Sequence, residues 1–305
     1  MDSKIKQMSL EEVREFLAAK QGALVDTLPP EHFAERHIPG AVNACVHEVV
    51  FLDTLAGLVA DKDAPVVLYG AGPKSVDCKC AAEKLIRAGY TDVTVFTGGL
   101  DAWRQAGQVL EGVAAEAVIP PHPPLVLESR TYHIVPEESK ILWTGRNSNG
   151  GHHGLLFVSG GYLEGGETPS ASFTMDMKSL RNLDLEGDEL RPVLEAHLNS
   201  DDFFFTALFP EATFTSTLLR IADTGEISRP NAMMQGVLAL RGMEDEIAFP
   251  AHIRNLTDGR ITVMGNLDFD RTHWGVIYGS SRFFQHLGYH VVFDFISADF
   301  RLVLE

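Results

Sequence analysis

The chain has 305 residues, of which 45% are hydrophobic and 22% charged, and its formal net charge is −17. This composition excludes a wholly disordered chain, a collagen and a disulfide-dense miniprotein. The negative charge disfavours binding to nucleic acid and to anionic membrane surfaces. Because a single hydrophobic core stops growing at roughly 250–300 residues, we expect two domains.

The first residues of the chain and the number of cysteines indicate the cellular compartment. The first eight residues are followed by no apolar export signal. No apolar run reaches the roughly 20 residues of a membrane-spanning helix. Cys45, Cys78 and Cys80 are an odd number of cysteines, which fits free thiols better than a disulfide framework. We expect a cytoplasmic protein with no integral membrane segment.

Residues 1–112 alternate helical and strand signals. Ser9 and Glu12 form a capping box ahead of an apolar stripe. Further along, we expect a short strand at 23–25, buried strands at 65–69 and 93–96, and helices at 81–88 and 100–106. Strands that alternate with helices predict an α/β domain with a parallel sheet covered on both faces.

A proline-rich stretch follows this first domain. Pro120, Pro121, Pro123 and Pro124 cannot continue a helix and favour an extended linker. We place the linker at residues 113–127 and the second domain at 128–305.

Residues 128–305 show a strand pattern. Strands are expected at 140–146, 154–162, 171–177, 212–221, 233–241, 247–255, 260–269 and 289–304, with one helix at 189–198. Eight strands are the number that closes a barrel able to hold one small ligand. Of the 18 phenylalanines, 14 lie here, which predicts an apolar interior.

Three ordered motifs of the first domain resemble the rhodanese family. They are Val25-Asp26, the stretch His37–Asn43, and Gly98–Trp103 followed by Gly107. The resemblance implies a nucleophilic cysteine directly after the strand at 66–69. That cysteine opens a loop whose backbone N–H groups stabilise a thiolate. Gly70 stands at this position, so the sequence predicts that the domain is inactive and serves in docking or regulation.

The loop after this strand is therefore interpreted as a degenerate active site, formed by Gly70, Ala71, Gly72, Pro73, Lys74 and Ser75. The alternative is a sulfurtransferase that uses Cys78 or Cys80, because a cysteine in a first helical turn has a lowered pKa. Cys78 lies eight positions past the usual site and is expected a turn or two into the helix. The competing interpretation places both as small residues packed beneath the sheet. Cys45 is expected in the core.

The second domain resembles the YceI family over residues 130–305. The matching stretches are Trp143–Arg146, Gly154–Gly160, Leu198–Phe204, Pro210–Phe214, Gly236–Gly242 and Asp270–Gly275. The resemblance implies a lipocalin-like antiparallel barrel that binds isoprenoids or other long apolar ligands. Relatives that bind isoprenoids are usually exported, so a different amphiphile is an alternative. An insertion at 181–192 is expected to reshape the barrel mouth.

The candidate ligand-binding residues are Trp143, Phe157, Phe204, Phe214, Arg271, Trp274, Phe293 and Phe295. Any single phenylalanine fits the core better than a ligand contact, whereas the N–H of Trp143 or Trp274 can meet a polar head group at a barrel mouth. Arg271 either anchors that head group or pairs with Asp268 or Asp270.

We expect no metal and no other cofactor, and the ligand that the resemblance implies is a prenyl quinone or another isoprenoid. The resemblance to the YceI family also implies a homodimer. Nine of the twelve histidines follow residue 121, which leaves a metal-dependent enzyme built on the barrel as another alternative. His152 and His153 are adjacent, and on a strand they would face opposite sides.

Overall fold

The computed structural model describes residues 5–117, 124–222 and 226–305. The chain divides into two compact units, Met1–Ile119 and Pro120–Glu305. Val113 N–H donates to Ala34 O at 3.0 Å within the first unit. Val126 N–H donates to Asn255 Oδ1 at 2.8 Å within the second. The predicted linker prolines at 120–123 lie outside the described residues.

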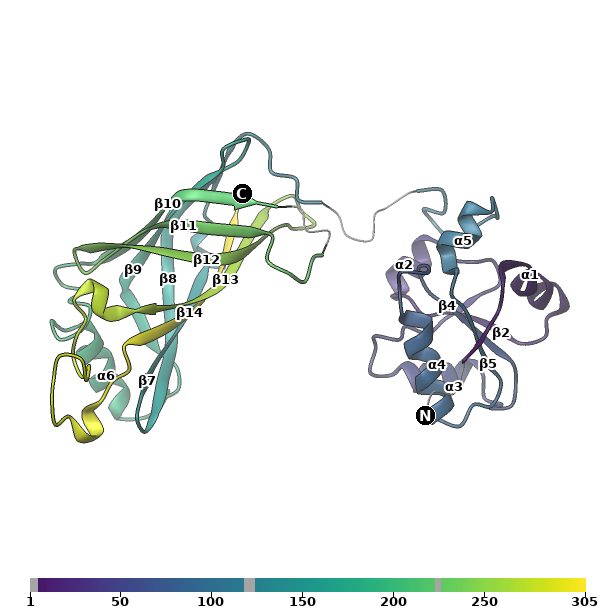
Figure 1. Cartoon of the computed structure of the whole chain (residues 1–305), viewed down its shortest axis with the longest axis horizontal. Helices are drawn as coiled ribbons and strands as arrows, with labels where there is room; N and C mark the ends of the chain where they lie inside the picture. The colour runs from purple at the N-terminus through teal and green to yellow at the C-terminus, as the bar shows by residue number, and fades with distance from the viewer. Residues whose placement is uncertain (1–4, 118–123, 223–225) are drawn as a thin grey trace. The chain divides into compact units, whose positions relative to one another are not determined.

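The first unit is a five-stranded sheet with helices on both faces (Figure 1). The order is β1-β5-β4-β2-β3, and all pairings are parallel. The strands are β1 (Lys6–Gln7), β2 (Ala23–Asp26), β3 (Val42–Asn43), β4 (Val66–Tyr69) and β5 (Val93–Phe96). The helices are α1 (Leu10–Ala19), α2 (Pro30–Glu35), α3 (Phe51–Leu58), α4 (Asp77–Arg87) and α5 (Gly99–Gln105). The predicted α/β class is confirmed.

Local sequence explains these elements. Ser9 caps α1 as predicted: its backbone N–H donates to Glu12 Oε2 at 2.7 Å, and Glu12 N–H donates to Ser9 Oγ at 3.3 Å. β4 is apolar throughout because its alternate residues serve two cores. Val66 and Leu68 pack with α3 and α4 on one face, whereas Val67 and Tyr69 pack with α1 and α5 on the other.

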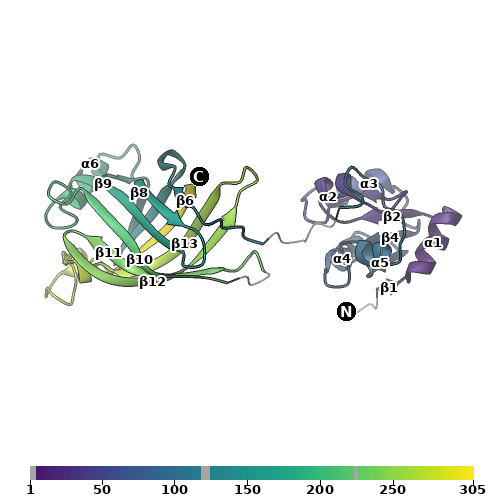
Figure 2. The same cartoon turned by 90° about the horizontal axis from the view of Figure 1, so that it is seen from above.

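The second unit is an antiparallel barrel of eight strands (Figures 1 and 2). The order is β8-β7-β14-β13-β12-β11-β10-β9, closed by pairing of β8 with β9. β6 pairs with residues 162–164 of β8, beyond the part of β8 that pairs with β7. The strands are β6 (Thr131–His133), β7 (Lys140–Asn147), β8 (Gly150–Glu164), β9 (Ser170–Asn182), β10 (Glu211–Ile221), β11 (Ala232–Leu240), β12 (Met243–Asn255), β13 (Ile261–Asp270) and β14 (Phe295–Leu304). The helix α6 is Leu190–Asn199, and short 3₁₀ turns lie at Pro136–Glu138, Arg271–Trp274 and Gly288–His290.

The predicted barrel of eight strands with one helix is confirmed. The last strand differs, since β14 begins at Phe295 rather than at residue 289. The backbone before it pairs elsewhere: Val292 N–H donates to Gly279 O at 2.8 Å, and Phe293 N–H donates to Arg146 O at 2.9 Å. Residues 271–294 therefore form a lobe between β13 and β14, called the rim lobe below.

The two ends of the barrel differ in packing. Pairing of β6 with β8, and of the end of β14 with the start of β13, brings together Tyr132, Leu163, Ile253, Ile261 and Leu304, all almost completely buried. This end is filled by side chains. The opposite end carries the β7–β8 turn, α6 and the rim lobe (Figure 1).

Candidate ligand-binding site

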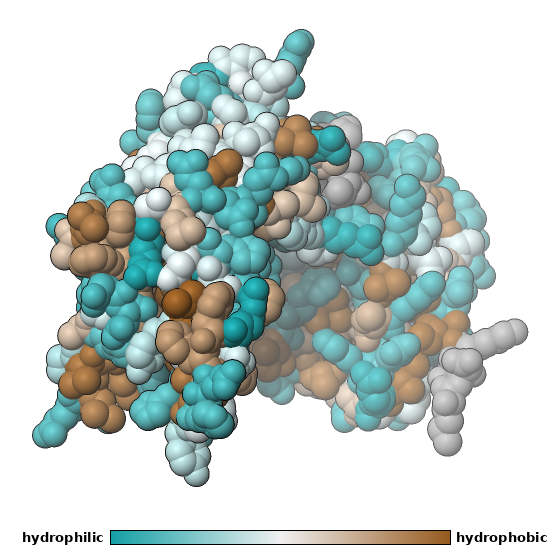
Figure 3. Space-filling model, turned by 60° about the vertical axis from the view of Figure 1, so that its left-hand side comes forward, coloured by the Kyte–Doolittle hydropathy of each residue, from teal (hydrophilic) through white to brown (hydrophobic). Residues whose placement is uncertain are grey.

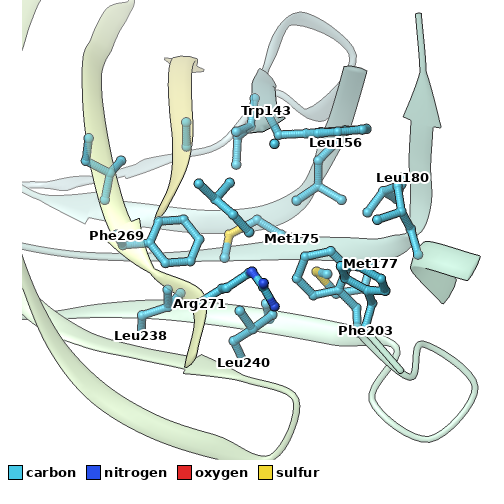
Figure 4. Close-up of a pocket in the computed structure, with 18 of the residues that line it drawn as sticks. Trp143, Leu156, Met175, Met177, Leu180, Phe203, Leu238, Leu240, Phe269 and Arg271 are labelled. Atoms are coloured by element: carbon cyan, nitrogen blue, oxygen red, sulfur yellow. The ribbon is translucent and has the colours of Figure 1, made fainter. Parts of the chain in front are cut away.

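A cavity of about 330 Å³ lies inside the barrel. This volume falls in the range of small-molecule sites, roughly 300–1,000 Å³. Side chains from all eight barrel strands, α6 and the rim lobe form its wall. Figure 4 shows the labelled apolar side chains Leu156, Met175, Met177 and Leu240 converging on this space.

Strand alternation builds this wall. Successive side chains of a strand point to opposite faces, and on β9 the residues Phe173, Met175 and Met177 line the cavity in alternation, with Leu180 further along. The intervening residues Thr174 and Asp176 are polar, so this part of the strand has one apolar and one solvated face. The two methionines add a flexible, polarizable surface that adapts to ligands of irregular shape.

Five of the eight residues proposed from sequence line the cavity: Trp143, Phe204, Phe214, Arg271 and Phe293. They come from β7, β10, the rim lobe and the segment after α6, which lie far apart in sequence. Only closure of the barrel brings them to one space.

Phe157, Phe295 and Trp274 do not line the cavity. Phe157 and Phe295 are 44% and 56% exposed, because the inward positions beside them belong to Leu156 and Ile296. Trp274 is buried behind the wall, where Nε1–H donates to Leu238 O at 2.7 Å. Its indole packs edge-on against Phe269, with ring centroids 5.4 Å apart. Trp274 therefore stabilises the barrel and does not meet a head group.

Arg271 pairs with neither carboxylate considered from sequence. Its guanidinium donates to backbone carbonyls of the rim lobe: Nε to Phe293 O at 3.1 Å, and Nη2 to Tyr278 O at 2.8 Å and Val292 O at 3.1 Å. Nη1 donates to Val276 O. The side chain thus joins the beginning of the rim lobe to its end and lies among apolar cavity residues (Figure 4).

The charge of Arg271 is held in an apolar setting. Its side chain is only 2% exposed, and the carboxylate of Asp294 lies 3.9 Å from Nη2. Removal of the guanidinium from water lowers the pKa of Arg271, and Asp294 partly opposes this shift. Buried charge without a close partner is costly, so the carbonyl contacts are what retain the arginine here.

The cavity opens at the end that carries α6 and the rim lobe. Its lining there includes partly exposed residues, among them Asn147, Leu194 and Phe293. The side chains of His152 and His197 are 36% and 34% exposed and line the same space. We call these five residues the mouth.

The surface beside the mouth is partly apolar. Figure 3 shows apolar side chains in several separate groups on the face of the barrel domain that is turned forward. Large exposed apolar residues on α6 and the rim lobe are Leu190, Val193, Phe283, Phe284 and Tyr289.

The insertion after β9 supplies a carboxylate to the mouth. Asp184 Oδ2 lies 2.8 Å from His152 Nδ1, and Oδ1 accepts His153 N–H and Asn182 Nδ2–H, both at 2.7 Å. Burial alone would raise the pKa of Asp184, but these hydrogen bonds outweigh it and hold the pKa at about 2. Sequence reasoning missed this cluster, since only the fold brings residue 184 to residue 152.

In the rhodanese-like loop, the carboxylate of Asp77 lies beside Gly70. A Cβ on Gly70 would be 3.0 Å from Asp77 Oδ2. Ser75 Oγ–H donates to the same carboxylate, and His47 Nε2 lies 3.2 Å from Asp77 Oδ1. The space next to Gly70 is therefore filled by an anionic group of the chain itself.

The cysteines depart from expectation in two respects. α4 begins at Asp77, so Cys78 lies in the first turn and not deeper in the helix. Cys78 is buried, and this burial, with the adjacent charge of Asp77, raises the pKa of its thiol. Cys80 is exposed, because it lies on the solvent side of α4, so its expected packing beneath the sheet is wrong. Cys45 is buried as expected.

Across 5–117, 124–222 and 226–305, no group of three or more histidine, cysteine or acidic side chains is placed to hold a metal ion. His152 and His153 both approach Asp184, the latter with Nδ1 at 3.6 Å from Oδ1. In the same part of the chain, no helix has the length and apolar character needed to cross a membrane.

A family model of the YceI-like domain matches residues 132–304, more than half of the chain. The chain is a member of the YceI-like family. Residues 9–106 of this YceI-like protein match the model of the rhodanese-like domain. The predicted fusion of the two domains is confirmed.

The rhodanese-like domain has a curated relative. It is 33% identical over 107 residues to the thiosulfate sulfurtransferase GlpE of Pseudomonas aeruginosa, covering 34% of this chain and 88% of that protein. The first domain thus belongs to the rhodanese-like family.

Two solved structures are similar to the YceI-like domain. One is BcnA of Burkholderia cenocepacia, 19% identical, covering 56% of this chain and 98% of that chain with a TM-score of 0.43. The other is a polyisoprenoid binding domain from Saccharophagus degradans, 17% identical, covering 57% of this chain and 97% of that chain, also with a TM-score of 0.43.

Proposed function

We propose that the YceI-like domain binds an apolar small molecule, such as a prenyl quinone or another isoprenoid, and that the rhodanese-like domain serves in docking or regulation. The observation that carries the proposal is the cavity of about 330 Å³ with an apolar wall, filled at one end and open at the other. A pocket of this form takes up a chain end-on.

The energetics favour a long apolar ligand. Each buried CH₂ group contributes roughly 0.8 kcal/mol, so a chain of several isoprene units would gain enough to bind from dilute solution. The wall offers few polar groups to select a particular chain, and Met175 and Met177 can adjust to branching methyl groups. Length and apolar character, more than a precise chain structure, would then set affinity.

The role of the first domain rests on Gly70 and Asp77. Glycine supplies no nucleophile. The carboxylate of Asp77 lies next to Gly70 and would repel an anionic sulfur adduct, which supports a role without sulfur transfer. The expected cytoplasmic location is supported by the three free thiols. The expected homodimer and lack of nucleic-acid binding are also part of this proposal, the latter supported by the net charge of −17.

Native mass spectrometry of the freshly purified full chain, followed by solvent extraction, tests the proposal. We expect a bound apolar species of a few hundred daltons that is lost on denaturation, or a complex formed with added prenyl quinone. An empty protein that takes up no prenyl quinone, in mass or in melting temperature, would overturn the proposal.

Two neighbouring residues of β8 provide a matched pair of variants. Leu156 lines the cavity, whereas Phe157 faces outward. We expect Leu156→Trp to fill the cavity and weaken binding at least tenfold, and Phe157→Trp to bind like the wild type. Equal binding by the two variants would place the ligand outside the barrel.

A further inference from the structure

The mouth of the cavity holds two imidazoles, each in contact with a carboxylate. His152 Nδ1 lies 2.8 Å from Asp184 Oδ2, and His197 Nε2 lies 3.2 Å from Asp202 Oδ2. Both rings line the cavity, whose remaining wall is mainly apolar. They are polar groups where a ligand in the barrel would emerge into water.

The carboxylates determine which ring nitrogen carries the proton. An ionised carboxylate only accepts hydrogen bonds, so a neutral His152 is protonated at Nδ1 and a neutral His197 at Nε2. The opposite nitrogens, Nε2 of His152 and Nδ1 of His197, then each offer a lone pair. Neither has a hydrogen-bond partner among the described residues. Both ring nitrogens can therefore accept a hydrogen bond from a ligand.

Aromatic rings fix the position of the His197 imidazole, and open space lies beside the His152 imidazole. His197 packs edge-on against Phe203 and Tyr278, with ring centroids 4.9 and 4.6 Å apart. Gly145 lies opposite His152 in the β7–β8 pairing, and a Cβ added to Gly145 would meet nothing within 4 Å. This open space beside the imidazole is where a small head group would lie.

The charges around the mouth disfavour an anionic head. Asp184 and Asp202 contact the two imidazoles directly. The nearby guanidinium of Arg191 is already paired with Glu195, at 3.0 Å, and with Glu186, at 3.7 Å. A carboxylate or phosphate ligand would therefore meet two negative groups at the imidazoles. Arg146 and Arg271 also line the cavity, but Arg146 Nη1 donates to Ser297 Oγ at 2.8 Å, and the Arg271 guanidinium donates to four backbone carbonyls.

We propose that the ligand is a neutral amphiphile, an apolar chain that ends in a hydroxyl group, held with its chain in the barrel and its O–H donating to His152 or His197. This inference rests on the proposed function and adds the class of head group and its orientation. The filled end of the barrel, at Leu163 and Leu304, leaves the mouth as the only place in the described barrel for the polar end.

Displacement of an apolar fluorescent probe by dodecane, dodecanol and laurate tests this inference, with the full chain at pH 8, where an ordinary imidazole is neutral. We expect dodecanol to bind about three- to tenfold more tightly than dodecane, as one net hydrogen bond provides. Laurate should bind more weakly than dodecanol. The double variant His152→Phe/His197→Phe should lose the preference for dodecanol yet still bind dodecane.

His153→Phe is the control, because His153 also contacts Asp184 but does not line the cavity. It should keep the preference for dodecanol. Equal affinities for dodecane and dodecanol in the wild type, or tightest binding of laurate, would overturn the head-group inference while leaving the apolar site intact. Failure of all three compounds to displace the probe would instead contradict the proposed function.

Discussion

The carboxylate of Asp77 fills the space next to Gly70. A Cβ on Gly70 would lie 3.0 Å from Asp77 Oδ2, 3.1 Å from Asp77 Cβ and 3.4 Å from Thr27 Oγ1. The missing nucleophile at position 70 and the acidic side chain at position 77 are thus one coupled feature. A larger residue at position 70 requires Asp77 to shift, and a thiolate there would face a like charge.

Restoring a cysteine at position 70 tests this relationship. In a Cys80→Ser background, we expect the thiol of Gly70→Cys to have a pKa above the ordinary value of about 8.5, since a nearby carboxylate disfavours a thiolate. Adding Asp77→Asn should lower that pKa by about one unit or more. The pH dependence of alkylation by iodoacetamide measures both values. Identical titration curves for the two variants would mean that Asp77 does not control this space.

Asp26 makes stability depend on pH. The residue is fully buried, Oδ1 accepts Leu28 N–H at 2.8 Å, and Oδ2 has no hydrogen-bond partner. Burial raises the pKa of Asp26 from 3.8 to about 6. The folded chain therefore retains a proton that the unfolded chain has lost, so stability falls between about pH 4 and pH 6 and stays lower above that.

Asp26→Asn should remove this dependence while keeping the acceptor for Leu28. We expect it to stabilise the first domain at pH 8 by up to about 3 kcal/mol, from roughly 1.4 kcal/mol per pKa unit, and to have little effect below pH 4. Scanning calorimetry of the full chain at both pH values measures this difference. An equal shift at the two pH values would point to packing and not to ionisation.

Removal of the Arg271 guanidinium should loosen the rim lobe. Arg271→Met leaves the carbonyls of Val276, Tyr278, Val292 and Phe293 without their donor. We expect a loss of about 3 kcal/mol or more, since each buried unsatisfied group costs roughly 1–3 kcal/mol. The thermal midpoint of the barrel and the rate of proteolysis between residues 276 and 293 report the effect. A variant as stable and as resistant as the wild type would show that the lobe is held by other contacts.

The three thiols should differ in reactivity. Cys80 is exposed, whereas Cys45 and Cys78 are buried and the pKa of Cys78 is raised. We expect alkylation of the native chain at pH 8 to modify Cys80 at least tenfold faster than the others, as peptide mass spectrometry would show. Faster modification of Cys78, together with alkylation-sensitive turnover of thiosulfate, would favour the sulfurtransferase alternative instead.

The order and class of elements could be predicted from the sequence because they depend on local patterns. The capping box at Ser9 and Glu12 marks α1, and the apolar run of β4 marks a strand buried on both faces. In the second domain, alternation along β9 and β10 predicts one apolar and one solvated face for each strand. Ordered motifs were also sufficient to recognise both families.

What only the tertiary structure decided is which side chains share the cavity. Phe157 and Leu156 are equally apolar neighbours, yet strand register turns one outward and the other inward. Arg271 finds its partners in carbonyls up to 22 residues away, and Asp184 meets His152 across 32 positions. Sequence periodicity specifies the faces of an element, but contacts between distant elements depend on barrel closure and loop paths, which no local pattern encodes.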